Sequence, residues 1–176
     1  MDKLTFSVYQ KEEITELIAN VVIELLNKQG KVKGINSSRI MKCRTVVLCY
    51  KEGIAIAVGA IKGKTNSDFS PNKANLDLIK DEFEWELGYF FTDSSHRGLG
   101  IAAFITKLLL SGHENINLLA STELFPKNGM VKILLNNGFL QIGNPWKSQI
   151  HDGLLGLFIR AKEGNIKNSK PTELLG

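Results

Sequence analysis

The chain has few residues that cross-link or interrupt a fold: its 176 residues include two cysteines and four prolines. Two thiols alone supply too few ligands for a zinc site. Cys43 and Cys49 are six residues apart. Within a single strand they would lie roughly 20 Å apart and could not pair with each other. We interpret both as buried thiols in a reducing compartment.

Long apolar runs are also missing. A membrane-spanning helix needs about 18 or more consecutive apolar residues, and no run approaches that length. The first residues, 1–10, alternate with polar positions and lack the apolar core of a signal peptide. We therefore expect a cytoplasmic protein that does not contact a membrane.

Neither sign of charge dominates, because 22 Lys and Arg face 18 Asp and Glu, for a net charge of +4. The segment 28–44 nevertheless contains six basic residues and no acid. A solvated face is the default interpretation of such a run. A nucleic-acid partner is disfavoured but not excluded, because binders of nucleic acid gather basic residues on one face.

The length and the absence of a linker predict a single domain over 1–161, followed by a polar C-terminal tail over 162–176. Apolar periodicity predicts a mixed sheet with helices on its faces, an α/β (α+β) arrangement. The expected strands are 4–9, 45–50, 54–61, 84–92, 116–120, 139–142 and 154–159, and the expected helices are 14–26, 97–111 and 126–137. The polar stretch 62–80 is an unusually long loop, of the kind that is functional or disordered.

The most informative segment is the turn after strand 84–92, which reads Arg97-Gly98-Leu99-Gly100-Ile101-Ala102. The first turn of a helix presents unpaired N–H groups and the positive end of the helix dipole. Glycines let an anion approach this backbone closely, and Arg97 adds a fixed positive charge. The combination suits a diphosphate, although glycines at a helix start also occur simply to relieve crowding.

Two other phosphate motifs fit less well. The dinucleotide fingerprint would place its third glycine at Ala103, and it should follow the first strand rather than lie past mid-chain. A Walker loop needs one more residue between Gly59 and Gly63-Lys64-Thr65. We interpret the latter segment as an exposed turn.

The glycine turn resembles the central motif of the GCN5-related N-acetyltransferase (GNAT) family, and two flanking segments strengthen the resemblance. Residues 85–91 resemble the family's fourth strand, and 130–139 resemble its last helix, which closes in Gly-Phe. The resemblance implies a mostly antiparallel central sheet whose fourth and fifth strands splay apart around acetyl-CoA. It also implies direct transfer of the acetyl group to a primary amine, without a metal or a covalent enzyme intermediate.

The resemblance also implies which residues hold the cofactor. Backbone groups of the fourth strand would pair with the pantetheine arm, amides of the glycine turn would hold the pyrophosphate, and an asparagine would contact the cofactor near the last helix. The implied residues are Phe91, Thr92, Arg97, Gly98, Leu99, Gly100, Ile101, Ala102 and Asn128.

The sequence departs from the family pattern in two places. The family often has asparagine where this chain has Lys127, and Asn128 comes one residue late. Many members have a tyrosine that protonates the leaving thiolate, and Leu134 stands in that position. This second departure supports the alternative of a non-catalytic acyl-CoA-binding or regulatory module on the same fold; a protein for another nucleotide is a third interpretation.

Glu84 and Glu86 are the candidate general bases, because residues two apart in a strand share a face. We favour Glu86, which lies nearer the expected acetyl position, and a bulge in this strand would re-aim one of the two. Both are alternatively solvated edge charges. Ser121, expected just after the fifth strand, is a candidate to orient a water, while His113 is expected at the surface and His151 in a turn that reaches the acceptor side or has no role.

The amine acceptor is not specified by any motif. A protein amine, a polyamine or antibiotic, and a charged tRNA all remain open. We expect the loop 62–80 and the segment 37–43 to border its site, because loops carry specificity. The basic segment 28–44 is alternatively a contact for an anionic acceptor or for the CoA 3′-phosphate. The apolar strand 154–158 is either internal or pairs across a homodimer.

Overall fold

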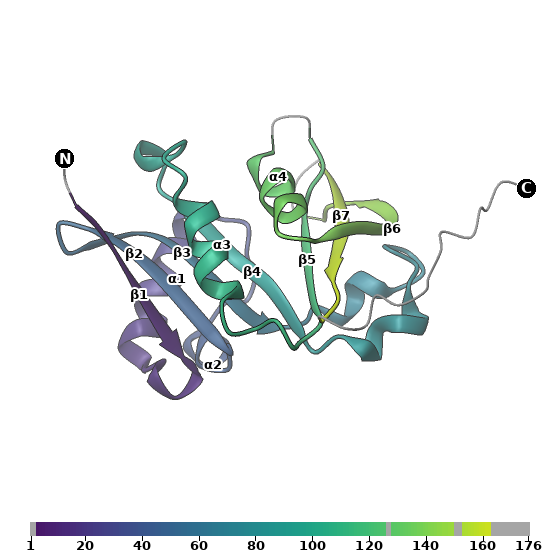
Figure 1. The fold of residues 1–176 in the computed structure, drawn as a ribbon, viewed down its shortest axis with the longest axis horizontal. Helices are drawn as coiled ribbons and strands as arrows, with labels where there is room; N and C mark the ends of the chain where they lie inside the picture. Colours follow the sequence, from purple (N-terminus) through teal and green to yellow (C-terminus); the bar gives the residue numbers. More distant parts are fainter. Residues whose placement is uncertain (1–2, 126–127, 150–152, 163–176) are drawn as a thin grey trace, which may run out of the picture.

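The computed structural model describes residues 3–125, 128–149 and 153–162, which form a seven-stranded sheet with strand order β1-β2-β3-β4-β5-β7-β6 (Figure 1). Neighbouring strands run antiparallel except for β4 and β5, which are parallel. This confirms the expected mixed, mostly antiparallel sheet. The strands are β1 (Leu4–Gln10), β2 (Thr45–Lys51), β3 (Ile54–Gly63), β4 (Trp85–Thr92), β5 (Leu118–Glu123), β6 (Leu140–Lys147) and β7 (Leu154–Arg160).

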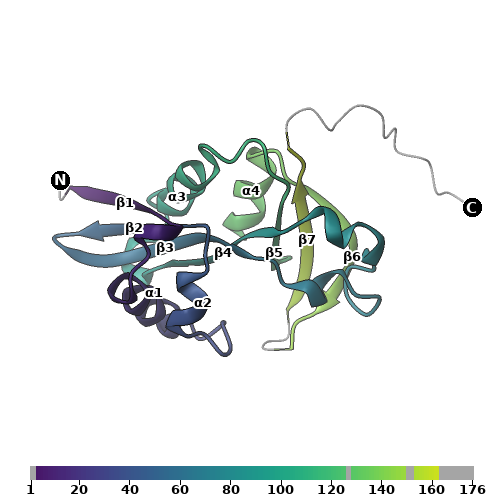
Figure 2. The same ribbon diagram turned by 90° about the horizontal axis from the view of Figure 1, so that it is seen from below.

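Helices cover both faces of the sheet, as expected. Helices α1 (Glu16–Gln29) and α2 (Ser37–Met41) lie on one face, and α3 (Ile101–Leu110) and α4 (Gly129–Asn136) lie on the other (Figure 2). Alternate strand residues feed the two cores: Val47 packs with α3, whereas Val46 packs with α1. Within the described residues no helix is both long and apolar enough to cross a membrane.

The segment between β3 and β4, expected as a long loop, packs as a third core. It contains two 3-10 helices, Asn66–Phe69 and Asp77–Glu82. Phe69 and Phe83 are buried against Leu119 and Trp146, on the face of the sheet opposite α4. This packing places the segment over β5, β6 and β7, on the same side of the sheet as α1 and α2.

Strands β4 and β5 splay apart after a very short contact. Only Trp85 with Leu118, and Glu86 with Leu119, are paired between them. Beyond that point β4 continues along β3, and β5 continues along β7. The sheet therefore opens into a wedge at its centre, which confirms the expected splay.

A bulge in β4 changes which side chains face each side of this wedge. The β3–β4 register shifts between Val58 and Ala60, and Tyr89 adopts a φ of +56°. Before the bulge Leu87 packs toward α3; after it Phe90 packs toward α3, while Tyr89 and Phe91 pack toward α1. The inserted residue shifts the alternation by one position, as a bulge does.

Several sequence expectations are wrong in detail. Helix α2 was not predicted, α3 begins at Ile101 rather than at Arg97, and Ser121 lies inside β5 rather than after it. Cys43 precedes β2 instead of lying in it, so the two buried free thiols lie in different cores on opposite faces of the sheet. His113 is not at the surface, because only 6% of it is exposed. Strand β7 is internal, between β5 and β6.

Candidate active site

A cleft follows the wedge between β4 and β5, with a volume of about 1450 Å³. That exceeds the roughly 300–1,000 Å³ of common small-molecule pockets, so it has room for an extended ligand and a second, smaller one. The two faces of the sheet divide it. We call the part on the α3/α4 face the glycine-turn side; it includes Arg97, Gly98, Gly100, Ile101, Ala102, Met130, Ile133 and Leu134. We call the part on the α1/α2 face the charged side; it includes Lys31, Lys33, Arg39, Lys42, Lys62, Lys64, Asp68, Glu86 and Glu123.

The glycine turn at the start of α3 exposes its backbone to the cleft. Gly98 and Gly100 have φ values of +80° and +77°, which other residues rarely adopt, and no atom lies within 4 Å of where their Cβ atoms would stand. Arg97 Nε donates to the Thr92 carbonyl at 3.3 Å, which ties the turn to the end of β4. The turn is thus shaped and kept open by its glycines.

The start of α3 differs from the starts of the other helices. In α1, α2 and α4 the N-cap side chains of Thr15, Asn36 and Asn128 accept a first-turn N–H. The N-cap of α3 is Gly100, which has no side chain to do this. Since the first-turn N–H groups of a helix have no intrahelical acceptor, those of α3 are left available to a ligand in the cleft.

Three predicted cofactor residues have more limited contacts than expected. The Leu99 side chain is 63% exposed, and Leu99 is not among the residues that line the cleft. Phe91 is buried in the core under α1, so only its backbone is placed to meet a ligand. Asn128 lines the cleft, but its Oδ1 accepts from Met130 N at 2.9 Å and its Nδ2 donates to Thr122 Oγ1 and to the Glu123 carbonyl. Its amide holds α4 against β5.

Leu134, in the position where the family often has tyrosine, lines the cleft and is fully buried. It supplies no proton donor. Among the described tyrosines only Tyr89 lines the cleft. Burial raises the pKa of its phenol to about 12, with the nearby Cys43 adding to the effect, so the group is neutral and able to donate.

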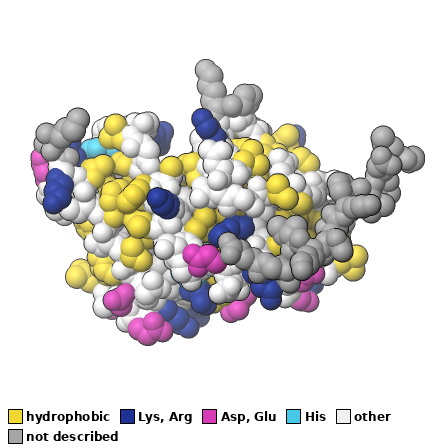
Figure 3. All heavy atoms as spheres, in the orientation of Figure 1, with side chains coloured by type: hydrophobic (Ala, Val, Ile, Leu, Met, Phe, Trp, Pro, Cys, Tyr) yellow, Lys and Arg dark blue, Asp and Glu magenta, His cyan; other side chains and the backbone are white. Residues whose placement is uncertain are grey.

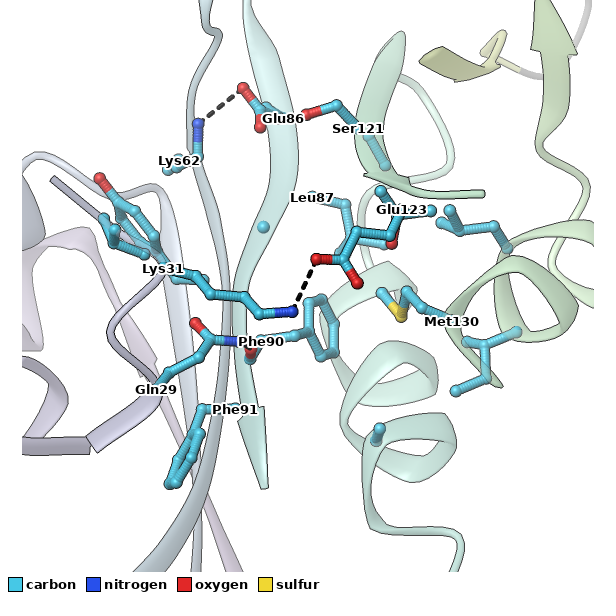
Figure 4. Close-up of a pocket in the computed structure, with 18 of the residues that line it drawn as sticks. Gln29, Lys31, Lys62, Glu86, Leu87, Phe90, Phe91, Ser121, Glu123 and Met130 are labelled. Atoms are coloured by element: carbon cyan, nitrogen blue, oxygen red, sulfur yellow. Dashed lines mark hydrogen bonds and ion pairs between the residues drawn. The ribbon is translucent and has the colours of Figure 1, made fainter. Parts of the chain in front are cut away.

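Glu86 is one of two buried carboxylates on the charged side, with 5% of the residue exposed; Asp68 is the other. Glu86 Oε2 accepts from Lys62 Nζ at 2.6 Å (Figure 4). The same oxygen accepts from Thr65 N at 2.8 Å. Both bonds use the same oxygen, so Oε1 is left to accept from a ligand or a water. Ser121 points toward this carboxylate from β5 across the wedge (Figure 4).

Glu84 and Glu86, predicted together, are separated by the structure. Glu84 precedes β4, is exposed, and does not line the cleft. The regular alternation that would place both on one face requires both to lie in the strand, and β4 begins only at Trp85. Of the two candidate bases, only Glu86 is in the cleft.

Lys31 and Glu123 form an ion pair of 2.7 Å across the wedge (Figure 4). Lys31 follows α1, and Glu123 ends β5, so 92 residues separate them. No local signal in the sequence links two residues this far apart. The pair joins the two halves of the sheet over the charged side.

The basic residues of the segment 28–44 fall into two groups, one that lines the cleft and one that does not. Lys31, Lys33, Arg39 and Lys42 line the cleft. Lys28 instead pairs with Glu24 at 3.3 Å on α1, and the Arg44 guanidinium lies 5.5 Å from the centre of the Trp85 ring. The interpretation as a merely solvated face is therefore incomplete, because four of the six basic residues line the cleft.

Neither of the two cysteines is among the residues that line the cleft. Burial raises the pKa of the Cys43 thiol to about 12 and also raises the pKa of Cys49. The thiolate is the reactive form, so both are poor nucleophiles near neutral pH. Within the described ranges no group of three or more His, Cys, Asp or Glu is placed to hold a metal ion. His151 and Lys127 lie outside the described residues.

No protein-family model matches the sequence, and no curated protein matches it. Solved structures do match the fold. An acyl-CoA N-acyltransferase from Pseudomonas aeruginosa superposes with a TM-score of 0.62 at 11% identity, covering 90% of this chain and 100% of that one. YncA of Salmonella typhimurium, a putative acetyltransferase solved with acetyl-CoA, gives 0.61 at 9% identity, covering 93% and 96%.

Further solved structures match the fold in the same way. NatC, solved with a Gag peptide and CoA, gives a TM-score of 0.63 at 13% identity, covering 89% of this chain and 97% of that one. Other matches, from Staphylococcus aureus and Streptococcus pneumoniae, are an N-acetyltransferase and a GNAT-family acetyltransferase. At these identities the likeness establishes that the chain has the fold of GNAT acetyltransferases.

Proposed function

We propose that the protein is an N-acetyltransferase that moves an acetyl group directly from acetyl-CoA to a primary amine. The observation that carries the proposal is the coincidence of two features in one cleft. An uncapped helix start with open glycines lies on one face of the wedge, and a buried carboxylate with one free oxygen, Glu86 Oε1, lies on the other.

The glycine-turn side suits the cofactor. The N–H groups at the start of α3, together with Arg97, would bind the pyrophosphate of CoA. The backbone of β4 beyond Leu87 no longer pairs with β5, so it has edge groups to offer the pantetheine arm and the thioester carbonyl. Thr92 and Phe91 would contribute through their backbone, as the resemblance implies.

The charged side suits the acceptor. Glu86 would accept a proton from the amine through Oε1, directly or through a water held by Ser121. Its other oxygen, Oε2, is already held by Lys62 and Thr65. The amine nitrogen then attacks the thioester carbonyl, the carbon–sulfur bond breaks, and the leaving thiolate takes up a proton to become the CoA thiol. With Leu134 in place of a tyrosine, we assign that last proton to a water in the cleft.

A non-catalytic CoA-binding module is the second candidate, and Leu134 is the observation that favours it. The two candidates share the cofactor half of the argument and differ in turnover. A module would bind acetyl-CoA and release no CoA in the presence of any amine.

The test has a binding step and a turnover step. Thermal unfolding with acetyl-CoA, CoA, ATP and NAD at equal concentration should show stabilisation by acetyl-CoA and CoA alone, because a ligand of the native state raises its stability. Release of CoA thiol is then followed with a panel of primary amines. Stabilisation by ATP or NAD in preference to acetyl-CoA would overturn the proposal; stabilisation without release of CoA would favour the module.

A further inference from the structure

On the charged side, cationic side chains outnumber carboxylates, and this excess bears on the charge of the acceptor. Its six cationic side chains face three carboxylates. All nine lie on the α1/α2 side of the sheet, where the acceptor would bind under the proposed function. On the opposite face, by contrast, Lys and Arg are scattered among hydrophobic side chains rather than gathered into one patch (Figure 3).

Each carboxylate of the charged side already has a cationic partner. Glu86 pairs with Lys62 at 2.6 Å, and Glu123 pairs with Lys31 at 2.7 Å. Asp68, 5% exposed, pairs with Lys73 at 2.9 Å. A polycationic acceptor would therefore find no carboxylate to neutralise a second ammonium group without displacing one of these lysines.

Three of the cationic side chains, unlike the carboxylates, have no partner of opposite charge among the described residues. Lys33, Arg39 and Lys42 line the cleft and form no ion pair with any described residue. All three come from the short segment around α2 that faces the wedge. Cationic side chains that line a cleft together raise the local concentration of anions there.

Arg39 is the best placed of the three to bind an anion. Its backbone N–H is held by the Asn36 side chain at 3.0 Å, which fixes the residue in the first turn of α2. Its Nη1 donates to the carbonyls of Lys33 and Gly34 at 3.4 and 3.2 Å. These bonds hold one terminal nitrogen of the guanidinium, and the other two nitrogens, Nε and Nη2, are left to bind a carboxylate or a phosphate.

We propose that the acceptor is a small primary amine that itself carries a carboxylate or a phosphate. This rests on the proposed function. The amine group approaches Glu86, and the anionic group binds Arg39 with Lys33 and Lys42. Overall the ammonium gives up two protons, one to solvent by way of Glu86 and one to the leaving thiolate, as the amide forms and the thioester breaks.

The test compares acceptors that differ only in the anionic group. We would measure CoA release with β-alanine against β-alaninamide, with O-phosphoethanolamine against ethanolamine, and with spermidine as the cationic case. The anionic member of at least one pair should have a kcat/KM higher by at least about 10-fold, the value of one charge-assisted hydrogen bond. The pair that shows the larger ratio identifies the carboxylate or the phosphate as the anionic group.

Substitutions test whether Arg39 is responsible for the preference for anionic acceptors. Arg39→Gln should lower kcat/KM for the anionic member by about 10-fold or more, and by much less for its neutral partner. Lys107→Gln is the matched control, because Lys107 is exposed on α3 and does not line the cleft. Raising the salt concentration should shrink the preference of the parent protein, because exposed cations are screened.

The outcomes separate this inference from the proposed function. Equal or faster turnover of the neutral amines or of spermidine overturns the anionic acceptor while leaving the acetyltransferase intact. If no amine is turned over, the same pairs are compared for their stabilisation of the CoA-bound protein. Equal stabilisation by both members of each pair then overturns the anionic site as well.

Discussion

The two sides of the cleft are built in opposite ways. On the glycine-turn side, the groups proposed to hold the pyrophosphate come from one short stretch, Arg97 to Ala102, and are mostly backbone groups. The charged side is assembled from side chains of the segment after α1, of β3, β4 and β5, and of the loop before β4. Backbone suits a constant ligand group and tolerates little change, whereas side chains are easily exchanged. The proposed cofactor site is therefore local in the sequence, whereas the proposed acceptor site is brought together only by folding.

The largest effect is expected from a negative charge introduced on the glycine-turn side. Ala102→Glu places a carboxylate in the first turn of α3, where the pyrophosphate is proposed to bind, and should weaken acetyl-CoA binding by about 100-fold or more. Titration calorimetry measures it. Gln141→Glu makes the same change in charge at an exposed position of β6 outside the cleft and should leave binding unaltered. Equal affinity in both variants would refute the placement of the pyrophosphate.

The next effect belongs to the charged side and should leave the cofactor untouched. Glu86→Gln removes the proposed base and should lower kcat by about 100-fold or more, with acetyl-CoA affinity little changed. Glu84→Gln is the matched control, since Glu84 is exposed outside the cleft, and it should retain parent kcat. Rates and dissociation constants are compared after circular dichroism shows that both variants fold. Loss of activity in the Glu84 variant instead would reverse the assignment.

A third prediction concerns Gly59 of β3, which lies opposite the bulge in β4. A Cβ on Gly59 would lie 2.6 Å from Ile105 Cγ2 and 2.9 Å from Phe90 Cε1, so Gly59→Ala should destabilise the fold by about 1–3 kcal/mol. Gly63→Ala, in the same strand, meets no atom within 4 Å and should cost less. Urea denaturation gives both free energies of unfolding. Equal stabilities would mean that the contact between β3 and α3 relaxes freely.

The smallest effect lies outside both sides. Burial, with the charge of Arg44 nearby, holds the pKa of His113 below its usual 6.5. As pH falls below that value the unfolded chain binds the proton first, so the free energy of unfolding should fall, until the folded-state pKa is passed. His113→Gln should therefore flatten the dependence of stability on pH between about pH 7.5 and pH 5. Denaturation curves at several pH values test it, and an unchanged slope would show that another group is responsible.

The local patterns of the sequence predicted the sheet, its helices on both faces and the glycine turn. The errors have identifiable physical causes. Helix α2 has only five residues, too few for a periodic signal. His113 follows a helix end, which is usually exposed, but it is buried where its Nε2 lies 3.3 Å from Thr45 Oγ1 of β2. Glu84 was paired with Glu86 because a strand was assumed to extend one residue too far.

In the candidate site, too, features set by neighbouring residues differ from those set by contacts between distant segments. Residue order alone was enough to identify the turn that would bind a diphosphate, because glycine conformation and helix-start N–H groups are properties of neighbouring residues. Together with the family resemblance, it also led to Glu86 as the favoured candidate base, and the structure places that side chain in the cleft. The partners of that base, Lys62 and Thr65, and the cross-wedge pair of Lys31 with Glu123 come from segments far apart in the chain. Such contacts depend on strand order, on the bulge in β4 and on the packing of α2, and these emerge only when the whole sheet is folded.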